Sequence, residues 1–385
     1  MRGFLKKVFV KNHLNINGKN AQEMASFSPL DSTKTFYFAP RGVQEYDLVD
    51  YDSKNLMGHL QKRFMLVDRR YFASFISGVK SRYPNESYIS YLDSKDVVEG
   101  NIPQKLSCMV KSFEEKDSND YPSLGVNNYE MFKEKMYKEV VVSRILNFMG
   151  SKTVYNAPCI VHKGGGRTPD YYVLSLDFIP KNHVFYSANS LYSVNGNRLG
   201  VESLVGSASD AIPLIKKEEF KLGIKDFANT LSKRRADVNI KNIQEDVVYS
   251  YLCRVFLLND KDFFTRNLGY LVNTETGEIS LGPGFDFEMT LEKQRRFNFE
   301  AIALRDLQYI IKNYPQVLDR FINMVNEISQ IDKKRGIPIY KKLIHKEIGE
   351  VELTNQFAAI IKGNIEQIQV LVERARENNL QIQMQ

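Results

Sequence analysis

Apolar and polar positions follow different patterns in the two halves of the chain. In the first half, short β-branched and aromatic runs separated by polar turns predict strands at Thr35–Phe38, Tyr88–Leu92 and Ser107–Phe113. Beyond about residue 210, apolar residues recur at the three- and four-residue spacing of amphipathic helices. We therefore expect an α+β protein with a sheet-rich N-terminal lobe and a mostly helical C-terminal lobe.

One helical pattern interrupts the sheet-rich half. Between Glu134 and Met149, apolar residues gather on one helical face, and Gly150 follows as a stop signal. The later run DYYVLSLDFIP, at Asp170–Pro180, ends at a proline before a segment rich in Asn, Ser and Gly, which predicts a hinge between the lobes. Further helices are expected over 245–258, 301–324, 338–348 and 352–379.

Length and charge narrow the class of protein. A single core stops growing near about 250–300 residues, so a chain of 385 residues is expected to form two lobes or domains. The net charge of +7 is the difference between 53 basic and 46 acidic residues, a small excess spread over a long chain. Nucleic-acid binding is therefore not indicated.

Cysteine usage and hydropathy bear on the compartment. Cys108, Cys159 and Cys253 stand far apart without a CxxC pair, which is typical of buried thiols in a reducing compartment and argues against a zinc site. The basic N-terminus has too few consecutive apolar residues for a secretory signal, and no later stretch is long enough to span a bilayer. We expect a cytoplasmic protein without a membrane segment; secretion without a cleaved signal would leave no trace here.

The segment from Asp262 to Asp286 carries the strongest chemical signal. A helix expected to end at Leu258 leads into the polar loop NDKDFFTRN, and a hairpin of LGYLV and ISLG separates Asn267 from Asp286. Phosphoryl transfer needs one carboxylate to orient the attacking hydroxyl, and an amide with a second carboxylate to hold Mg²⁺ on the phosphates. Asp262, Asn267 and Asp286 supply these groups in this order, with the D-x4-N spacing of a kinase catalytic loop. Because such spacing also arises by chance, upstream motifs decide its meaning.

A lysine and a helix glutamate precede this segment. In LSCMVKSF, Lys111 interrupts an apolar strand, where it either faces solvent or meets an anion such as a phosphate. Glu139 opens the apolar run VVVSRILNF and is the preferred carboxylate partner, with Glu134 and Glu130 as alternatives. The competing interpretation is an edge-strand lysine and a solvated glutamate.

A turn upstream of this lysine is a candidate for phosphate contacts. In FISGVKS, the backbone amides around Ser77 and Gly78 are expected to approach phosphates, because Gly78 admits the conformation that such a turn needs. The string Arg41–Glu45 competes for this role, but it lies much farther from Lys111.

The hinge is a candidate for adenine contacts. Leu176 and Phe178 flank Asp177, and the two apolar side chains are expected to sandwich an adenine whose edge bonds the backbone. The alternative is that these residues form plain core between the lobes.

In their order along the chain, these motifs resemble the HipA-like serine/threonine kinases, including the CtkA-type bacterial kinases. FISGVKSRY is similar to that family's phosphate loop, CMVKSF to its ATP-lysine strand, and YPSLGVNNYE with KEVVVSRILNFMG to the following loop and helix. SLDFIP resembles its hinge, LLNDKDFFTRNLGYL its catalytic loop and GPGFDFE its metal-binding segment. The resemblance runs from about residue 75 to residue 290.

This resemblance implies a bilobal protein-kinase-like fold that uses ATP and Mg²⁺. It divides the chain into an N-terminal extension or subdomain at 1–74, a sheet-rich nucleotide-binding lobe with the hinge at 75–180, and a helical catalytic lobe with a helical scaffold at 181–385. The implied catalytic residues are Asp262, Lys111 and Glu139, and the implied metal ligands are Asn267 and Asp286. The implied nucleotide contacts are Ser77, Gly78, Lys111, Leu176, Asp177, Phe178, Asn267 and Asp286.

The sequence departs from the family pattern at three places, and from the DFG of protein kinases at a fourth, where it reads DFE. The histidine that the family often has between the catalytic Asp and Asn is absent from FFTR. Lys80 stands where the family usually has glutamine, and Phe75 occupies the place of the phosphate-loop serine. Autophosphorylation of that serine silences toxin members of the family, and Ser77 is the nearest replacement here.

The implied function is ATP- and Mg-dependent phosphorylation of a serine or threonine in a protein substrate, in a toxin or effector that phosphorylates itself. The resemblance also implies a regulatory or antitoxin partner. One alternative is a kinase-like nucleotide-binding module with weak or lost phosphotransfer. A third interpretation, a helical interaction protein without a nucleotide site, rests on the long helical C-terminal part.

Overall fold

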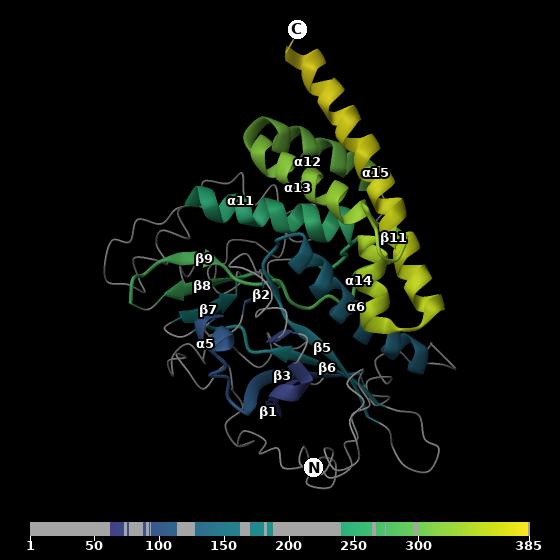
Figure 1. The fold of residues 1–385 in the computed structure, drawn as a ribbon. Helices are drawn as coiled ribbons and strands as arrows, with labels where there is room; N and C mark the ends of the chain where they lie inside the picture. The colour runs from purple at the N-terminus through teal and green to yellow at the C-terminus, as the bar shows by residue number, and fades with distance from the viewer. Residues whose placement is uncertain are drawn as a thin grey trace. The chain divides into compact units, whose positions relative to one another are not determined.

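The chain combines helices with small β-sheets (Figure 1). Its structure, a computed structural model, describes residues 62–72, 75–76, 88–89, 92, 94–113, 128–161, 170–180, 183–187, 240–263, 267–273, 275–295 and 299–383. This part divides into two compact units, the first from the described residues of Met1–Ser143 and Val154–Val184 and the second from those of Arg144–Thr153 and Phe185–Gln385. None of the described helices is both long and apolar enough to cross a bilayer.

The first unit is built on a four-stranded antiparallel sheet. Across the sheet the order is β1 (Lys62–Asp68), β3 (Lys105–Phe113), β6 (Asp170–Leu176) and β5 (Asn156–Val161). The strand expected at 107–113 is thus confirmed within β3. Since successive side chains of a strand point to opposite faces, Lys111 falls on the face away from Leu106 and Cys108.

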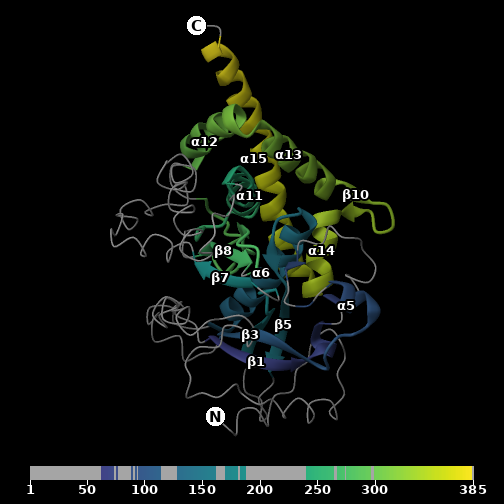
Figure 2. The same ribbon diagram turned by 90° about the vertical axis from the view of Figure 1, so that its left-hand side faces the viewer.

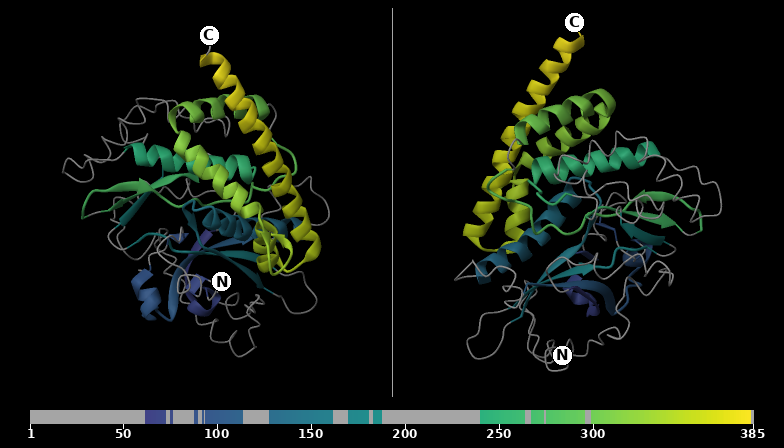
Figure 3. Two further views of the ribbon diagram at one scale, coloured as in Figure 1. Left: turned by 45° about the horizontal axis from the view of Figure 1, so that its top comes forward. Right: turned by 180° about the vertical axis from the view of Figure 1, so that it is seen from behind.

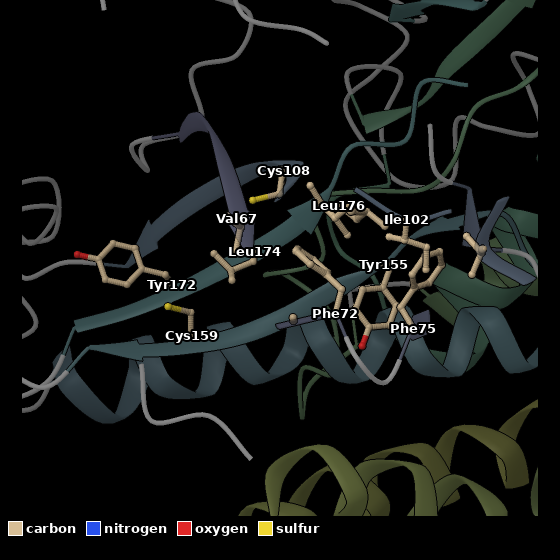
Figure 4. Close-up of a cluster of buried hydrophobic side chains, with 13 residues drawn as sticks. Val67, Phe72, Phe75, Ile102, Cys108, Tyr155, Cys159, Tyr172, Leu174 and Leu176 are labelled. Atoms are coloured by element: carbon tan, nitrogen blue, oxygen red, sulfur yellow. The ribbon is translucent and has the colours of Figure 1, made fainter. Parts of the chain in front are cut away.

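One face of this sheet carries a cluster of buried apolar side chains, which Figure 4 shows. Alternate residues of the strands supply it, so that Tyr172, Leu174 and Leu176 of β6 all point into the same cluster. Phe72 and Phe75 pack on Tyr155, with ring centroids 6.1 Å and 5.1 Å apart. The cluster consists of Val67, Phe72, Phe75, Val97, Ile102, Leu106, Cys108, Tyr155, Ala157, Cys159, Tyr172, Leu174 and Leu176.

Helix α6 (Asn128–Phe148) contacts the other face of the sheet through polar side chains. It starts six residues before the predicted 134–149 helix, and it ends where Gly150 adopts φ +70° and donates its N–H to Asn147 O. Ser143 Oγ donates to Val154 O over 2.5 Å, which ties the helix to the chain that enters β5. Smaller elements of this unit are η1 (Arg69–Phe72), α5 (Ser94–Glu99) and β2 (Tyr88–Ile89), which pairs with β4 (Thr153–Val154).

The second unit contains a hairpin and the helix that precedes it. Strands β8 (Gly269–Asn273) and β9 (Ile279–Leu281) form the hairpin expected from the sequence, and β7 (His183–Ser187) adds to its β8 edge. Helix α11 (Ile240–Tyr251) continues into η4 (Leu252–Leu257), one turn of π-helix in which every residue is buried. The predicted 245–258 helix is therefore confirmed, with a wider last turn.

Four further helices complete this unit. They are α12 (Phe299–Asn313), α13 (Pro315–Ser329), α14 (Ile339–Ile348) and α15 (Val351–Gln383), with a small pair β10 (Ile331–Asp332) and β11 (Ile337–Pro338) between α13 and α14. Helix α15 packs against α12, α14 and η4 (Figure 2, Figure 3). The single helix predicted over 301–324 is wrong, because Pro315 starts a new helix after the break at Tyr314.

Candidate functional site

In the first unit, Lys111 and Glu139 form a buried ion pair. Lys111 Nζ lies 2.7 Å from Glu139 Oε1, and the two residues are only 3% and 2% exposed. Strand alternation turns Lys111 away from the apolar cluster, and α6 brings Glu139 to the same face. Burying an unpaired charge in the protein interior costs several kcal/mol of free energy, and the ion pair offsets this cost for both side chains.

Two residues that the sequence analysis missed hold Glu139. Asn156 Nδ2 donates to the carbonyl oxygen of Glu139 over 3.1 Å and to Glu139 Oε2 over 3.5 Å. Ser175 Oγ donates to Asn156 Oδ1 over 2.7 Å, and the two residues are paired across β5 and β6. The available signal was a polar residue at a buried strand position, but only the register between two distant strands shows that they meet.

The other two glutamates considered for Lys111 pair locally along α6. Glu134 Oε1 lies 3.0 Å from Lys138 Nζ, and Glu130 Oε2 lies 3.5 Å from Lys133 Nζ. Of the three candidates, Glu139 is the one that the structure brings to Lys111.

The expected adenine contacts follow strand β6. Leu176 is fully buried in the apolar cluster, and Phe178 is half-buried. Asp177 is 5% exposed, and its N–H donates to Ser107 O over 3.0 Å. Burial raises the pKa of the Asp177 carboxyl to about 6, against the opposing effect of hydrogen bonds from the Ile179 N–H, the Ser107 hydroxyl and the Phe178 N–H. The expected phosphate turn at Ser77 and Gly78, like the competing string 41–45, lies outside the described residues.

In the second unit, the loop after η4 brings Asp262 and Asn267 together. Asn267 is buried, and its Nδ2 donates to the carbonyl oxygen of Asp262 over 2.7 Å and to Asp262 Oδ2 over 2.9 Å. Both amide hydrogens are thereby directed at Asp262, which leaves Oδ1 of Asn267 as the atom suited to a cation. The loop starts at Asn259, which has φ 50° and donates its side-chain amide to Glu292 O over 2.6 Å.

Asp286 follows the hairpin in an uncommon backbone conformation. Its φ of 62° lies in the left-handed region, which Asp tolerates better than most residues but which still stores strain. Its side chain is half-buried, while Phe287 beside it is fully buried and Phe285 packs edge-on against Phe185 at 5.9 Å. The strained backbone of Asp286 thus lies between two aromatic residues that are themselves packed.

Arg254, which the sequence analysis did not single out, joins the loop to the Asp286 segment. Its Nε and Nη2 both lie 2.6 Å from Asp260 Oδ2. Its Nη1 donates to Asn267 O and its Nη2 to Phe285 O, each over 3.4 Å. One guanidinium therefore contacts a proposed metal ligand and the residue directly before the other.

The donor set fits Mg²⁺ bound together with a phosphate. Asp262, Asn267 and Asp286 offer two half-buried carboxylates and one amide oxygen, and Mg²⁺ in proteins is usually held by one or two carboxylates plus substrate phosphates and water. Within the described ranges, no group of three His, Cys, Asp or Glu side chains converges as a self-sufficient metal cage would require.

Comparisons with known proteins add remote similarities. No family model and no curated protein matches the chain. Among solved structures, the Helicobacter pylori proinflammatory kinase CtkA is similar over 71% of this chain and 91% of its own, with 16% identity and a TM-score of 0.40. A chain of the HipA, HipB and operator DNA toxin–antitoxin complex of Shewanella oneidensis MR-1 is similar over 70% of this chain, with 12% identity and a TM-score of 0.41. The match spans 60% of that chain, and both scores are too low to establish a shared fold.

Proposed function

We propose that this chain is an ATP- and Mg-dependent serine/threonine protein kinase of the HipA-like type, with a bilobal kinase-like arrangement. The observation that carries the proposal is the contact between Asp262 and Asn267. The side-chain amide of Asn267 donates both hydrogens to Asp262, so its oxygen Oδ1 is the atom suited to a cation. The buried pair of Lys111 and Glu139 supplies the second part that phosphoryl transfer requires, a cation for the phosphates.

Each residue has a distinct role in this proposal. Asp262 orients the attacking hydroxyl and accepts its proton, and Asn267 Oδ1 and the Asp286 carboxylate hold Mg²⁺, which neutralises charge on the phosphates. Lys111 steadies the nucleotide phosphates, and Glu139 fixes the ammonium in place. The remaining proposed nucleotide contacts are Ser77, Gly78, Leu176, Asp177 and Phe178.

A transfer assay tests this proposal. Purified protein with Mg²⁺ and γ-labelled ATP should label itself or a protein in a lysate, and Asp262→Asn should lower transfer by roughly a hundredfold or more. Asp319→Asn on α13, where the carboxylate pairs with Arg376 near the surface, is the matched control and should leave transfer unchanged. Absence of labelling by the wild-type protein would contradict the kinase proposal.

Glu288 favours a second candidate, a nucleotide-binding module with weak or lost transfer. It stands at the third position of DFE and is half-buried beside the fully buried Phe287, so the segment has a bulky acid where a kinase has glycine. Mg-ATP should then raise the melting temperature without turnover, and Asp286→Asn should abolish that shift. A shift that Asp286→Asn leaves intact would argue against both candidates.

Regulation and location are proposed on the same basis. A regulatory or antitoxin partner and autophosphorylation at Ser77 belong to the HipA-like proposal, and peptide mapping of protein made in bacteria tests the latter. Cys108, Cys159 and Cys253 are all buried as free thiols, which suits a reducing compartment such as the cytoplasm.

A further inference from the structure

We propose that Arg254 is a positioning residue that locks the Asp262–Asn267 loop and the Asp286 segment into one metal-binding arrangement. The proposal rests on the phosphotransfer function proposed above. It assigns a role to a buried side chain whose guanidinium is engaged by Asp260, two backbone carbonyls and two aromatic rings, so that it acts on the metal ligands indirectly.

The ion pair with Asp260 explains how such a charge can be buried. Asp260 is itself buried, its Oδ2 receives Nε and Nη2 of Arg254, and its Oδ1 accepts the N–H of Asp262 over 2.8 Å. Removing one partner of a buried ion pair strands the other in an apolar place, so the two residues must be changed together to separate folding from function. The Asp260 carboxylate also fixes the backbone at the start of the catalytic loop.

The guanidinium lies over one aromatic ring from each segment. Arg254 Cζ lies 5.0 Å from the centroid of Phe263, which directly follows Asp262, and 4.9 Å from that of Phe287, which directly follows Asp286. Both distances fall within the range of cation–π attraction. A planar guanidinium can stack on two rings and donate at its edges at the same time, whereas a lysine ammonium offers neither the plane nor the fork.

The two carbonyl contacts complete the bridge. Bonds of 3.4 Å to Asn267 O and Phe285 O are long, so each contributes little by itself. Arg254 thus contacts each of the two segments twice, once at a backbone carbonyl and once at an aromatic ring. A movement of either segment would break contacts with the other's anchor, which couples the position of Asn267 to that of Asp286.

The local helix geometry supports this assignment. Arg254 lies in the π-helical turn Leu252–Leu257, and its own carbonyl accepts the Asp260 N–H over 2.9 Å. π-Helical turns are rare in proteins and occur frequently at functional sites. Here the hydrogen bond from the Asp260 N–H to the Arg254 carbonyl links the π-helical turn to the residues just before Asp262.

Binding of Mn²⁺ in the presence of a non-hydrolysable ATP analogue, followed by electron paramagnetic resonance, tests the role without requiring activity. The informative variants are Arg254→Lys and the double variant Arg254→Met/Asp260→Leu, which replaces the buried pair by apolar side chains of similar size. Both should bind Mn²⁺ about tenfold or more weakly, as expected for residues that orient ligands. Affinity for the analogue without metal should stay within about twofold, because Arg254 is proposed to act on the metal ligands alone.

The matched control is a second buried arginine pair among the described residues of this unit. Arg144 Nε lies 3.0 Å from Glu347 Oε1, with both side chains largely buried, so Arg144→Met/Glu347→Leu perturbs packing to a similar degree. It should leave Mn²⁺ affinity unchanged.

The possible outcomes separate the two proposals. Wild-type Mn²⁺ affinity in a folded double variant would show that Arg254 is merely structural and overturn the positioning role. If the double variant does not melt cooperatively, Arg254→Lys decides, since it keeps a cation beside Asp260. If the wild-type protein binds no Mn²⁺ with the analogue, the phosphotransfer function fails and the positioning role fails with it.

Discussion

Lys111→Met should destabilise the protein strongly at neutral pH and weakly at pH 5. At 2.7 Å and an effective dielectric constant of about 20, the attraction between Lys111 and Glu139 is about 6 kcal/mol, which is offset by several kcal/mol of lost hydration for each ion. The intact pair therefore contributes little net stability. Removal of the ammonium leaves the Glu139 carboxylate buried, with Asn156 as its remaining hydrogen-bond donor among the contacts described above.

The expected loss follows from the way in which the stranded carboxylate can escape. Taking up a proton at pH 7 costs a glutamate with an ordinary pKa of about 4.3 about 4 kcal/mol, which sets an upper limit on the penalty. In the variant the folded state holds this proton more tightly than the unfolded state, so stability falls as pH rises above about 4.3. We expect a loss of about 3–4 kcal/mol at pH 7, roughly 10 °C in melting temperature, and about 1 kcal/mol at pH 5.

Thermal unfolding followed by circular dichroism at both pH values measures this effect. Lys111→Met/Glu139→Leu, which removes both charges, should recover most of the loss. Arg376→Ala is the control, since its pair with Asp319 is exposed and worth at most about 1 kcal/mol. A Lys111→Met protein that melts like the wild type at pH 7, or a double variant as unstable as the single one, would refute the reasoning.

Three further predictions concern single positions. Asp286→Gly should raise the melting temperature slightly, because it relieves up to about 1 kcal/mol of left-handed backbone strain, while Mg-ATP no longer shifts that temperature; a lower melting temperature would contradict this. Asp177→Asn should gain stability relative to wild type as pH rises from 4 to 7, by up to about 3 kcal/mol, because the raised pKa of about 6 makes the wild-type carboxylate costly above that pH; parallel pH profiles of melting would count against it. Gly282→Ala should lower the melting temperature by several degrees, since an added Cβ would lie 2.8 Å from the Phe185 ring and 3.0 Å from Gly269 O; an unchanged melting curve would show that both neighbours can move.

Structural features that depend on residues close together in the sequence could be predicted from the sequence. Lys111 inside an apolar run predicted a lysine that either faces solvent or meets an anion, and helical spacing predicted that Glu139 lies near an inward face. In the structure the two side chains form one buried ion pair. Pro315 shows the limit of the same method. The helical periodicity continues across this residue, but proline has no N–H to continue the preceding helix and is well suited to the first position of the next one.

Residues that depend on tertiary pairing could not be found in this way. Asn156 and Ser175 meet because of the register between β5 and β6, which no local pattern specifies. Arg254 did carry a signal, a charge inside the apolar run YLCRVFLL, which is the same kind of signal that singled out Lys111. Its partner Asp260 lies in a loop with two Asp residues, and the sequence alone does not say which one is buried.

Burial assigns different tasks to the two aspartates of the NDKD loop. Asp260 is buried and neutralised by Arg254, so it is inaccessible to a ligand and contributes no net charge to the surface of the loop. Asp262 is half-buried and its Oδ2 accepts a hydrogen bond from Asn267 Nδ2, so it is the more accessible of the two carboxylates. Asp260→Asn should therefore lower the melting temperature as well as nucleotide-dependent chemistry, because Asp260 holds both Arg254 and the Asp262 N–H, whereas Asp262→Asn should lower chemistry with little effect on melting. Equal effects of the two variants on both quantities would mean that burial does not divide the work between them.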